Sequence, residues 1–468
     1  MLKGTMKIEL TDVNSGETKT VLEQNMVTNA LTEIFKPLGL AKSPGKLLSS
    51  FAPYYQNLLG GLLLFDGAIE ENADNFFPPS NRKLIGCASY GVQNNTTGTQ
   101  RGGYNQTESE LNLKDRYMKY VYDFTTSQAN GTIASVCLTH KNGGYTSYGS
   151  EDAVYTSSFP LLQQVCDATL QYVYTSYTGA TTADKYQGVG VNTNEYIFAI
   201  DRGNDVVLYF RIDSTSKISI IKRRAYLKSV SVLENPYSQK AFIEEFPIDL
   251  PTALLGNYSY NFDISENALY ICSASASTTA AGSSFLLTKI NVSNWNVTQY
   301  SMTNTSNVTL TTSGSRYAFA HNGYVYIKCS ASPYDIYKFQ IGNAANVVKL
   351  NNKGTSIITG LPQLGINGRI YYEYHSSTSS NYLMWIANES TNEILKPENI
   401  RLYNSSYLPC VTPVIDEPLL YYLSVGSSQT TVDYMMMTNY LATINNLSDP
   451  VTKTADKTMK ITYIIQEQ

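Results

Sequence analysis

The stretch ENALYICSA (266–274), followed by SFLLTKINVSNWNV (284–297), decides the fold class. Each segment places Leu, Ile, Phe, Tyr or Cys in a short apolar run, and Asn, Ser and Glu mark the turns beside it. Apolar runs of this length between turn residues predict paired β-strands. The same pair of strands recurs along the chain. Its other first strands are NEYIFAI (194–200), NGYVYIKCS (322–330), NGRIYYEYH (367–375) and EPLLYYLSV (417–425).

The spacing of these copies predicts the architecture. Successive tyrosines of the first strands stand 74, 56, 45 and 50 residues apart, at Tyr196, Tyr270, Tyr326, Tyr371 and Tyr421. The last three steps suit one propeller blade of about 40 to 50 residues, and the first leaves room for an insertion near 222–240. An earlier unit at GTIASVCLTHKNGGY (131–145) brings the number to six or so. Because radial stacking buries both faces of each sheet, we predict a mainly β chain with a β-propeller of about six blades. An array of β-sandwich hairpins is the alternative.

The two ends of the chain predict a second, smaller domain. MKIELTDVNSGETKTVLEQN (6–25) reads as two strands joined by a turn at 14–17. In the last strand, Met459, Ile461, Tyr463 and Ile465 alternate with Lys460, Thr462, Ile464 and Gln466, which is the period of a half-buried strand. We expect this strand to complete the sheet that the N-terminal hairpin begins. Both chain ends then lie in one base domain, and the propeller is an insertion.

The expected domain bounds follow from composition. A polar, glycine-rich segment, GVQNNTTGTQRGGYNQ (91–106), marks the boundary. We expect an N-terminal base or anchoring domain at 1–106, completed by 450–468, and the propeller-like repeats at 107–449. The base should contain the one clear helix, NMVTNALTEIFKPLGL (25–40).

Composition excludes several classes of protein. Charged residues make up 15% of the 468, the net charge is −4, and 38 residues are tyrosine, so nothing favours nucleic acid as a partner. The longest apolar run, LLGGLLLFD (58–66), is far shorter than the roughly 20 residues of a membrane helix. We therefore expect no membrane insertion. Because MLKGTMKIELTDVN (1–14) has no apolar run behind its first lysine, we also expect no secretory signal. The six cysteines lie far apart and without metal spacing, which predicts no metal site, no cofactor and reduced, buried thiols.

Possible catalytic or metal-binding residues have plainer interpretations. DRGND (201–205) has two carboxylates, but Gly203-Asn204 is a turn dipeptide between two strands, so a hairpin is favoured over a calcium loop. Two of the three histidines, His140 and His321, precede turns and suggest a repeated blade corner; the third is His375. A glycosidase needs two carboxylates at a suitable separation, and the candidates are Glu266, Asp335, Asp416 and Glu417. Because no motif places these side chains together, we predict that the chain is not an enzyme.

Two surface features point to binding. The basic cluster Lys217, Lys222, Arg223, Arg224 and Lys228 reads as a solvated strand face in an acidic chain, with a nucleic-acid patch as the alternative. Tyrosine suits carbohydrate because its ring covers the C–H surface of a sugar while its hydroxyl forms hydrogen bonds. Within VYTSYTG (173–179), Tyr174 and Tyr177 are the candidate binding residues.

Three stretches resemble virion proteins of the tail or tail-fibre type, encoded by tailed bacteriophages and prophages of Gram-positive bacteria. They are MKIELTDVNSGETKTVLEQNMVTNAL (6–31), YDFTTSQANGTIASVCLTHKNGGYTSYGS (122–150) and TINNLSDPVTKTADKTMKITYIIQEQ (443–468). The resemblance covers both ends and the domain junction but not the repeats, and it supplies no catalytic residues. It implies a chain assembled in the bacterial cytoplasm and located in the virion. The base would contact other virion proteins, and we expect a symmetric homo-oligomer.

Three functions remain open from the sequence. In the first, the chain is a tail-fibre or baseplate component that presents its propeller for attachment to a host-surface glycan. In the second, it is a virion-associated enzyme that cleaves such a glycan. In the third, it is a capsid or neck decoration protein without a receptor.

Overall fold

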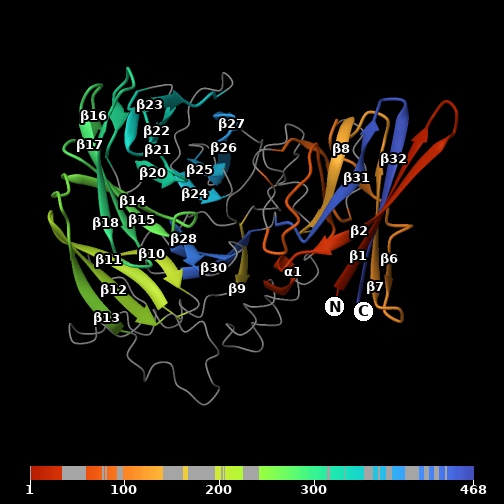
Figure 1. The fold of residues 1–468 in the computed structure, drawn as a ribbon, viewed down its shortest axis with the longest axis horizontal. Helices are drawn as coiled ribbons and strands as arrows, with labels where there is room; N and C mark the ends of the chain where they lie inside the picture. The colour runs from red at the N-terminus through yellow and green to blue at the C-terminus, as the bar shows by residue number, and fades with distance from the viewer. Residues whose placement is uncertain are drawn as a thin grey trace, which may run out of the picture.

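The fold divides into two β lobes in a computed structural model of the chain (Figure 1). The structure describes residues 2–33, 59–75, 79, 82–91, 98–140, 162–166, 195–201, 204, 206–224, 242–313, 317–331, 334–352, 362–366, 369–375, 382–395, 410–415, 421–425, 432–437 and 440–467. Nearly all regular structure in these ranges is β-strand, as the sequence predicts. No helix within them is long and apolar enough to span a bilayer.

One lobe is a nearly closed barrel that contains both ends of the chain. Its strands run in the order β4-β3-β8-β31-β2-β1-β32-β7-β5, and β6 pairs with β7. A parallel bridge between Cys87 and Arg101 brings the two outer ends of this order together. The bounds are β1 Leu2–Asp12, β2 Thr18–Val27, β3 Gly61–Phe65, β4 Leu84–Ala88, β5 Gly103–Tyr104, β6 Glu110–Asn112, β7 Tyr117–Phe124, β8 Gly131–Thr139, β31 Thr443–Lys453 and β32 Lys457–Glu467.

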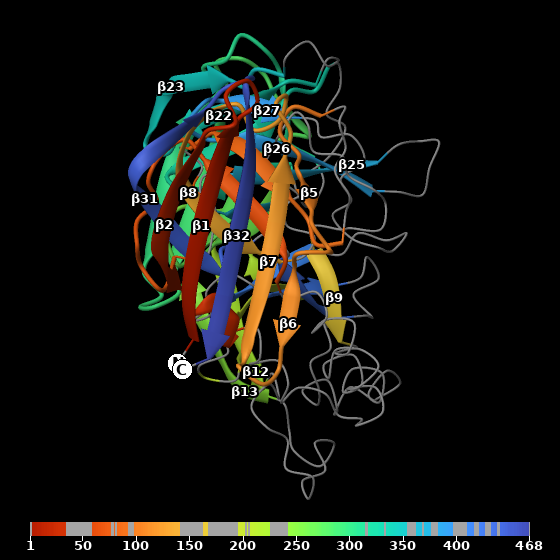
Figure 2. The same ribbon diagram turned by 90° about the vertical axis from the view of Figure 1, so that its right-hand side faces the viewer.

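The predicted pairing of the two chain ends is confirmed. Strand β32 runs antiparallel to β1 along its whole length, from Leu2 opposite Glu467 to Asp12 opposite Lys457. Figure 2 shows β2, β1, β32 and β7 side by side, with the two termini adjacent. Met459, Ile461, Tyr463 and Ile465 of β32 are buried, and the Tyr463 hydroxyl lies 2.6 Å from Thr443 Oγ1 inside the barrel. The residues that alternate along β32 in the sequence therefore lie on two faces of the strand, one inside the barrel and one outside it.

The other lobe is a β-propeller of five four-stranded blades within the described residues. Blade 1 contains β10 Glu195–Asp201, β11 Val206–Ser214, β12 Lys217–Arg224 and β13 Phe242–Asp249. Blade 2 contains β14 Asn257–Asp263, β15 Ala268–Ala274, β17 Ser284–Asn291 and β18 Val297–Thr303. Blade 3 contains β20 Ala318–His321, β21 Tyr324–Lys328, β22 Ile336–Gln340 and β23 Asn343–Lys349. Blade 4 contains β24 Pro362–Ile366, β25 Arg369–His375, β26 Tyr382–Asn388 and β27 Glu393–Leu395. A small pair, β16 Thr278–Thr279 and β19 Leu310–Thr311, lies beside blades 2 and 3.

The fifth blade closes the ring with a strand from before the first blade. It contains β28 Cys410–Ile415, β29 Tyr421–Val425 and β30 Val432–Met437, and its outermost strand is β9 Leu162–Cys166. The inner strands β10 and β28 of the first and last blades pair in parallel at Ile200 and Val414. The last blade is thus joined to the first both through its inner strand and through β9. Apolar side chains fill the spaces between blades, with Phe210 and Phe262 in one cluster and Phe285 and Val325 in the next.

The described residues form five blades, where about six were expected, and the barrel extends beyond the bounds expected for the base domain. The segment GTIASVCLT is β8 of the barrel, because it pairs with β3 and β31, so it adds no blade. The barrel therefore continues past residue 106 through β7 and β8, and it resumes at Thr443, ahead of 450. Of the helix expected at 25–40, the structure describes α1 Ala30–Glu33, and the positions beyond lie outside the described residues. LLGGLLLFD contains β3, a fully buried strand as interpreted.

Candidate functional site

The contact between the inner strands β14 and β20 is built from alternating polar side chains. Ser259, Asn261 and Asp263 stand two residues apart on β14 and face β20. The Ser259 hydroxyl donates to the Ala318 carbonyl over 2.9 Å. The Asn261 side chain donates to the Ala320 carbonyl over 2.7 Å and accepts from the Ala320 N–H over 2.8 Å. The side chains of β14 thus satisfy the open backbone edge of β20 in place of a paired strand.

Asp263 ends this ladder in a buried pair with His321. Asp263 Oδ1 lies 2.9 Å from His321 Nδ1, and Oδ2 accepts the Asn322 N–H over 2.8 Å. Oδ1 also accepts from the N–H and the hydroxyl of Ser265, over 3.1 and 2.8 Å. Asp263 is 1% exposed and His321 is 3% exposed. A carboxylate with this many donors is strongly held and joins blade 2 to blade 3.

The pair favours its charged state. Burial alone would lower the pKa of His321, but the hydrogen bond and charge of Asp263, helped by Glu389 and Glu266, raise it above its ordinary value. Burial would raise the pKa of Asp263, but its bonds from His321, Asn322 and Ser265 hold it below the ordinary value. Nδ1 therefore carries a proton toward the carboxylate. His321 Nε2 is buried and makes no hydrogen bond.

Two similar polar clusters flank the pair. In blade 2, Glu266 Oε2 accepts from the Tyr270 hydroxyl over 2.6 Å and pairs with the Lys289 ammonium. Tyr270 and Lys289 face each other across β15 and β17. Burial, together with the neighbouring Glu266, raises the pKa of the Tyr270 hydroxyl. This hydroxyl stays protonated and acts as a donor.

The equivalent cluster of blade 3 takes its glutamate from blade 4. Tyr326 and Lys338 face each other across β21 and β22. The Tyr326 hydroxyl donates to Glu389 Oε1 over 3.0 Å. The Lys338 ammonium donates to the Glu389 carbonyl and to Asn392 Oδ1, over 2.8 and 3.1 Å. This cluster thus links blades 3 and 4, as the Asp263–His321 pair links blades 2 and 3.

Two of these polar groups connect neighbouring blades and one lies within blade 2. Of the four candidate carboxylates, the structure describes Glu266 and Asp335, which lie in different blades. Glu266, in blade 2, bonds Tyr270 and Lys289. Asp335, in blade 3, bonds Lys349 over 2.6 Å. Asp416 and Glu417 lie outside the described residues, as do the binding candidates Tyr174 and Tyr177. Among the described residues, no group of three or more His, Cys, Asp or Glu is placed to hold a metal ion.

Other sequence interpretations have mixed outcomes. The hairpin expected at DRGND is confirmed at its described residues, because Asp201 at the end of β10 pairs with Val206 at the start of β11, and Asp201 accepts the Asn204 N–H over 2.8 Å. His321 does lie at a blade corner, but His140 follows β8 of the barrel, so the idea of a repeated corner histidine is wrong.

The basic cluster on β12 is only partly a solvated face. Lys222 pairs with Glu244 over 3.0 Å on the surface. Arg223 is fully buried and pairs with Glu195 over 2.8 Å. A run of like charges on a strand alternates between the two faces of the sheet, so these two neighbours cannot form one patch. Lys228 lies outside the described residues.

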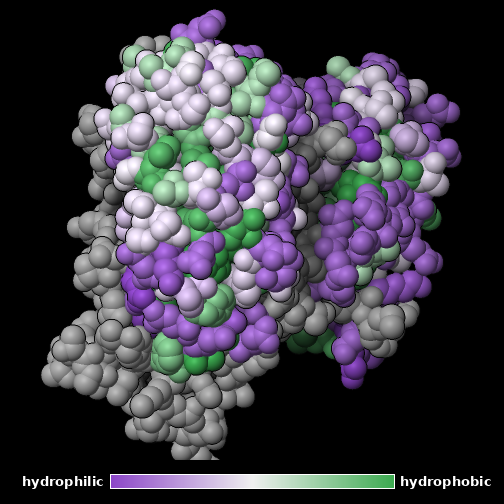
Figure 3. All heavy atoms as spheres, turned by 60° about the vertical axis from the view of Figure 1, so that its left-hand side comes forward, coloured by the Kyte–Doolittle hydropathy of each residue, from purple (hydrophilic) through white to green (hydrophobic). Residues whose placement is uncertain are grey.

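One face of the described surface is mostly hydrophilic or of intermediate hydropathy. On the face turned toward the viewer in Figure 3, hydrophilic residues and residues of intermediate hydropathy cover most of the described surface. Hydrophobic residues form smaller areas between them. Such a surface offers hydrogen-bonding groups over a wide area.

Comparison with known proteins leaves the family open. No known protein family and no curated protein matches the sequence. Among solved structures, the β-propeller domain of the Trilobed protease from Pyrococcus furiosus aligns with 75% of this chain and 83% of its own, at 9% identity and a TM-score of 0.26. Penicillium chrysogenum alpha-L-arabinanase aligns over 83% and 99%, at 11% identity and 0.26. Pyrococcus horikoshii acylaminoacyl peptidase aligns with 76% of this chain at 10% identity and 0.26, and the chain spans 47% of its length.

These structures come from enzymes, but identities and TM-scores this low say nothing about the activity of this chain. The assignment of blades rests on the strand order and pairing described above.

Proposed function

We propose that this chain is a structural, non-enzymatic virion protein of a tailed bacteriophage, with the barrel as its attachment base and the propeller presented outward for contact with a host-surface glycan. One observation carries the proposal. Strand β1 and strand β32, the two ends of the chain, pair with each other in the barrel, while the whole propeller is inserted between β8 and β31. A module held at one end by both of its termini has its inserted domain free to project.

Two further features support this reading. The sequence resemblance to tail and tail-fibre proteins is concentrated in the strands that form the barrel, at 6–31, 122–150 and 443–468. Two groups of charged residues in the described propeller, the Asp263–His321 pair and the Lys338 cluster, connect neighbouring blades. These groups serve as interblade contacts, which is a structural and not a catalytic use of charge.

Incubation of the purified chain with host cell-wall polysaccharide separates attachment from cleavage. We expect saturable binding without release of reducing ends. Release that increases with time and enzyme concentration would replace the attachment role with a glycan-cleaving one. Absence of both binding and release, with the chain present in purified particles by mass spectrometry, would leave a decoration or architectural role.

A further inference from the structure

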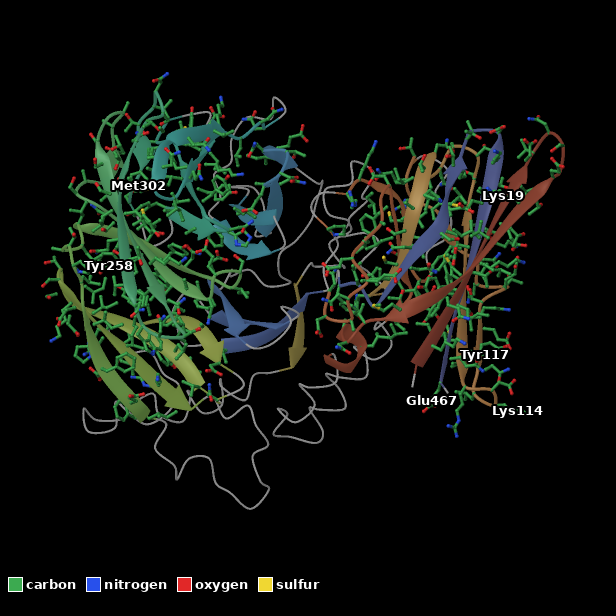
Figure 4. All side chains as sticks on the ribbon, in the orientation of Figure 1. Lys19, Lys114, Tyr117, Tyr258, Met302 and Glu467 are labelled. Atoms are coloured by element: carbon green, nitrogen blue, oxygen red, sulfur yellow. The ribbon has the colours of Figure 1, made fainter. Side chains whose placement is uncertain are left out.

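Two aromatic residues of the propeller have a backbone conformation that aromatic residues rarely adopt. Trp295 lies in the turn between β17 and β18 with a φ of 61°, and Tyr334 lies between β21 and β22 with a φ of 59°. Figure 4 shows the side chains of this lobe, in which Tyr258 and Met302 are labelled. Glycine and asparagine adopt this left-handed conformation readily, whereas a bulky side chain is strained in it. Each of the two rings therefore needs a physical reason to occupy its turn.

The position of Trp295 is explained by packing between blades 1 and 2. Its ring packs edge-to-face against Phe246 of blade 1, with 5.2 Å between the ring centroids. The Lys222 ammonium lies 5.5 Å from the Trp295 ring centroid and bonds Glu244 over 3.0 Å. An aromatic neighbour, a cation and a carboxylate of the chain thus complete this contact.

Tyr334 has the same type of lysine contact without the other partners. The Lys328 ammonium lies 5.5 Å from the Tyr334 ring centroid. Within the described part of the chain, neither this ammonium nor the Tyr334 hydroxyl forms a hydrogen bond or an ion pair. Both side chains are partly buried and partly exposed. Burial lowers the pKa of Lys328, and the neighbouring Cys329 opposes this shift.

The carboxylate next to Tyr334 in the sequence is already bound. Asp335 bonds the Lys349 ammonium over 2.6 Å and accepts from Asn352 Nδ2 over 3.1 Å. Lys349 therefore balances the charge of Asp335, and Lys328 has no counter-charge among the described residues. A partly buried ammonium suits an anion from outside the chain, because the fold has already removed part of its water and fixed its position.

We propose that Lys328 and Tyr334 form a binding site for an acidic sugar of the host-surface glycan. The Lys328 ammonium pairs with the carboxylate or phosphate of that sugar, and the Tyr334 ring and hydroxyl contact the sugar itself. This assignment rests on the proposed glycan-contact function and places that contact at the β21–β22 turn of blade 3. The strained conformation of Tyr334 then serves binding and not stability.

Titration of the full chain with three sugars, followed by ligand-detected NMR, tests the site. Glucuronic acid carries a carboxylate, glucose 6-phosphate carries a phosphate, and glucose carries neither. We expect at least one acidic sugar to bind saturably and about tenfold or more tighter than glucose. The tighter acidic sugar shows whether the glycan supplies a carboxylate or a phosphate.

A charge variant tests the lysine. Lys328→Met keeps the apolar stem but removes the charge, so it should weaken binding of the acidic sugar about tenfold or more. Lys114→Met makes the same change at an exposed position of the barrel, labelled in Figure 4, and should leave binding unchanged.

A turn variant separates a binding role of Tyr334 from a structural one. Tyr334→Gly relieves the left-handed conformation, so it should keep or raise the midpoint of thermal unfolding while it weakens acidic-sugar binding about tenfold or more. Trp295→Gly is the matched control. It removes the contact with Phe246 and should lower the midpoint without changing binding.

The site is overturned if neither acidic sugar binds, if glucose binds equally well, or if Lys328→Met or Tyr334→Gly leaves binding unchanged. It is also overturned if Tyr334→Gly lowers the midpoint as far as Trp295→Gly does. Host polysaccharide that binds the variants as well as the unaltered chain would refute this site and leave the glycan-contact function standing. Acidic sugars that bind here, with no binding of the polysaccharide, would support the site and refute that function.

Discussion

Removal of the Asp263 carboxylate should weaken the propeller more than any other single change at a blade seam. Asp263→Ala deprives the buried His321 imidazole, the Asn322 N–H and both Ser265 donors of their acceptor. Loss of one member of a buried pair costs about 3–5 kcal/mol, because the remaining charge and donors stay desolvated. Asp201→Ala is a matched control, since Asp201 also ends an inner strand and accepts the turn N–H of Asn204, but at a more exposed site. We expect a loss of about 1 kcal/mol there.

The assay can isolate the propeller. The only two tryptophans, Trp295 and Trp385, both belong to it, and the barrel has none. Denaturant unfolding followed by tryptophan fluorescence therefore reports the free energy of unfolding of the propeller lobe. A loss below about 1 kcal/mol for Asp263→Ala, equal to that of Asp201→Ala, would refute the reasoning.

The loss of unfolding free energy caused by Asp263→Ala should also depend on pH. The raised pKa of His321 contributes stability that is complete below the unfolded value near 6.5 and is lost as pH rises through the folded pKa. The lowered pKa of Asp263 contributes stability that is present above the unfolded value near 3.8 and is lost as pH falls through the folded pKa. The deficit of Asp263→Ala should therefore be greatest between about pH 4 and 6.5 and smaller at about pH 9. A deficit that grows above neutral pH would contradict the charged pair.

Three further changes test the packing. Asn261→Ala removes two hydrogen bonds to the neighbouring inner strand and should cost the propeller about 1–3 kcal/mol by tryptophan-monitored unfolding; a neutral effect would contradict the side-chain ladder. Gly365→Ala would place a Cβ 2.7 Å from the ring of His321 and should cost about 1–3 kcal/mol in the same assay, whereas a stabilised variant would show that the ring does not rest there. Tyr463→Phe removes the hydroxyl bonded to Thr443 Oγ1, which keeps its bond from the Leu138 N–H, and should lower barrel protection in hydrogen exchange by about 1 kcal/mol, with the tryptophan transition unchanged; a shift of that transition would show that the barrel contact also affects the propeller.

The sequence predicted the elements whose signals are local. The pairing of β32 with β1 followed from the alternation of Met459 to Ile465, and the strand pairs of blades 2 and 3 followed from turn residues beside apolar runs. GTIASVCLT was assigned to a blade because it has the same local pattern in a barrel as in a blade. Only its partners distinguish the two, and β-pairing partners are set by tertiary structure.

The hydrogen-bonded contact between blades 2 and 3 was not predicted. Asp263 and His321 are 58 residues apart, and they meet only because two inner strands lie side by side in the ring. The pattern SYNFD, with Ser259, Asn261 and Asp263 alternating with aromatic residues, was a visible signal that one face of this strand is polar and buried. The sequence did not predict that β9 is the outermost strand of the fifth blade, since its five residues, LQQVC, show little alternation of apolar and polar side chains.

Gold-labelled imaging of intact phage particles with two antibodies tests the central claim most directly. One antibody is raised against the propeller, residues 242–352, and the other against the β1–β2 and β31–β32 hairpins of the barrel. We predict that the propeller antibody labels intact particles and that the barrel antibody labels them only after dissociation. Labelling of the barrel with a hidden propeller would contradict the anchoring arrangement, and absence of both labels from particles would contradict a virion role.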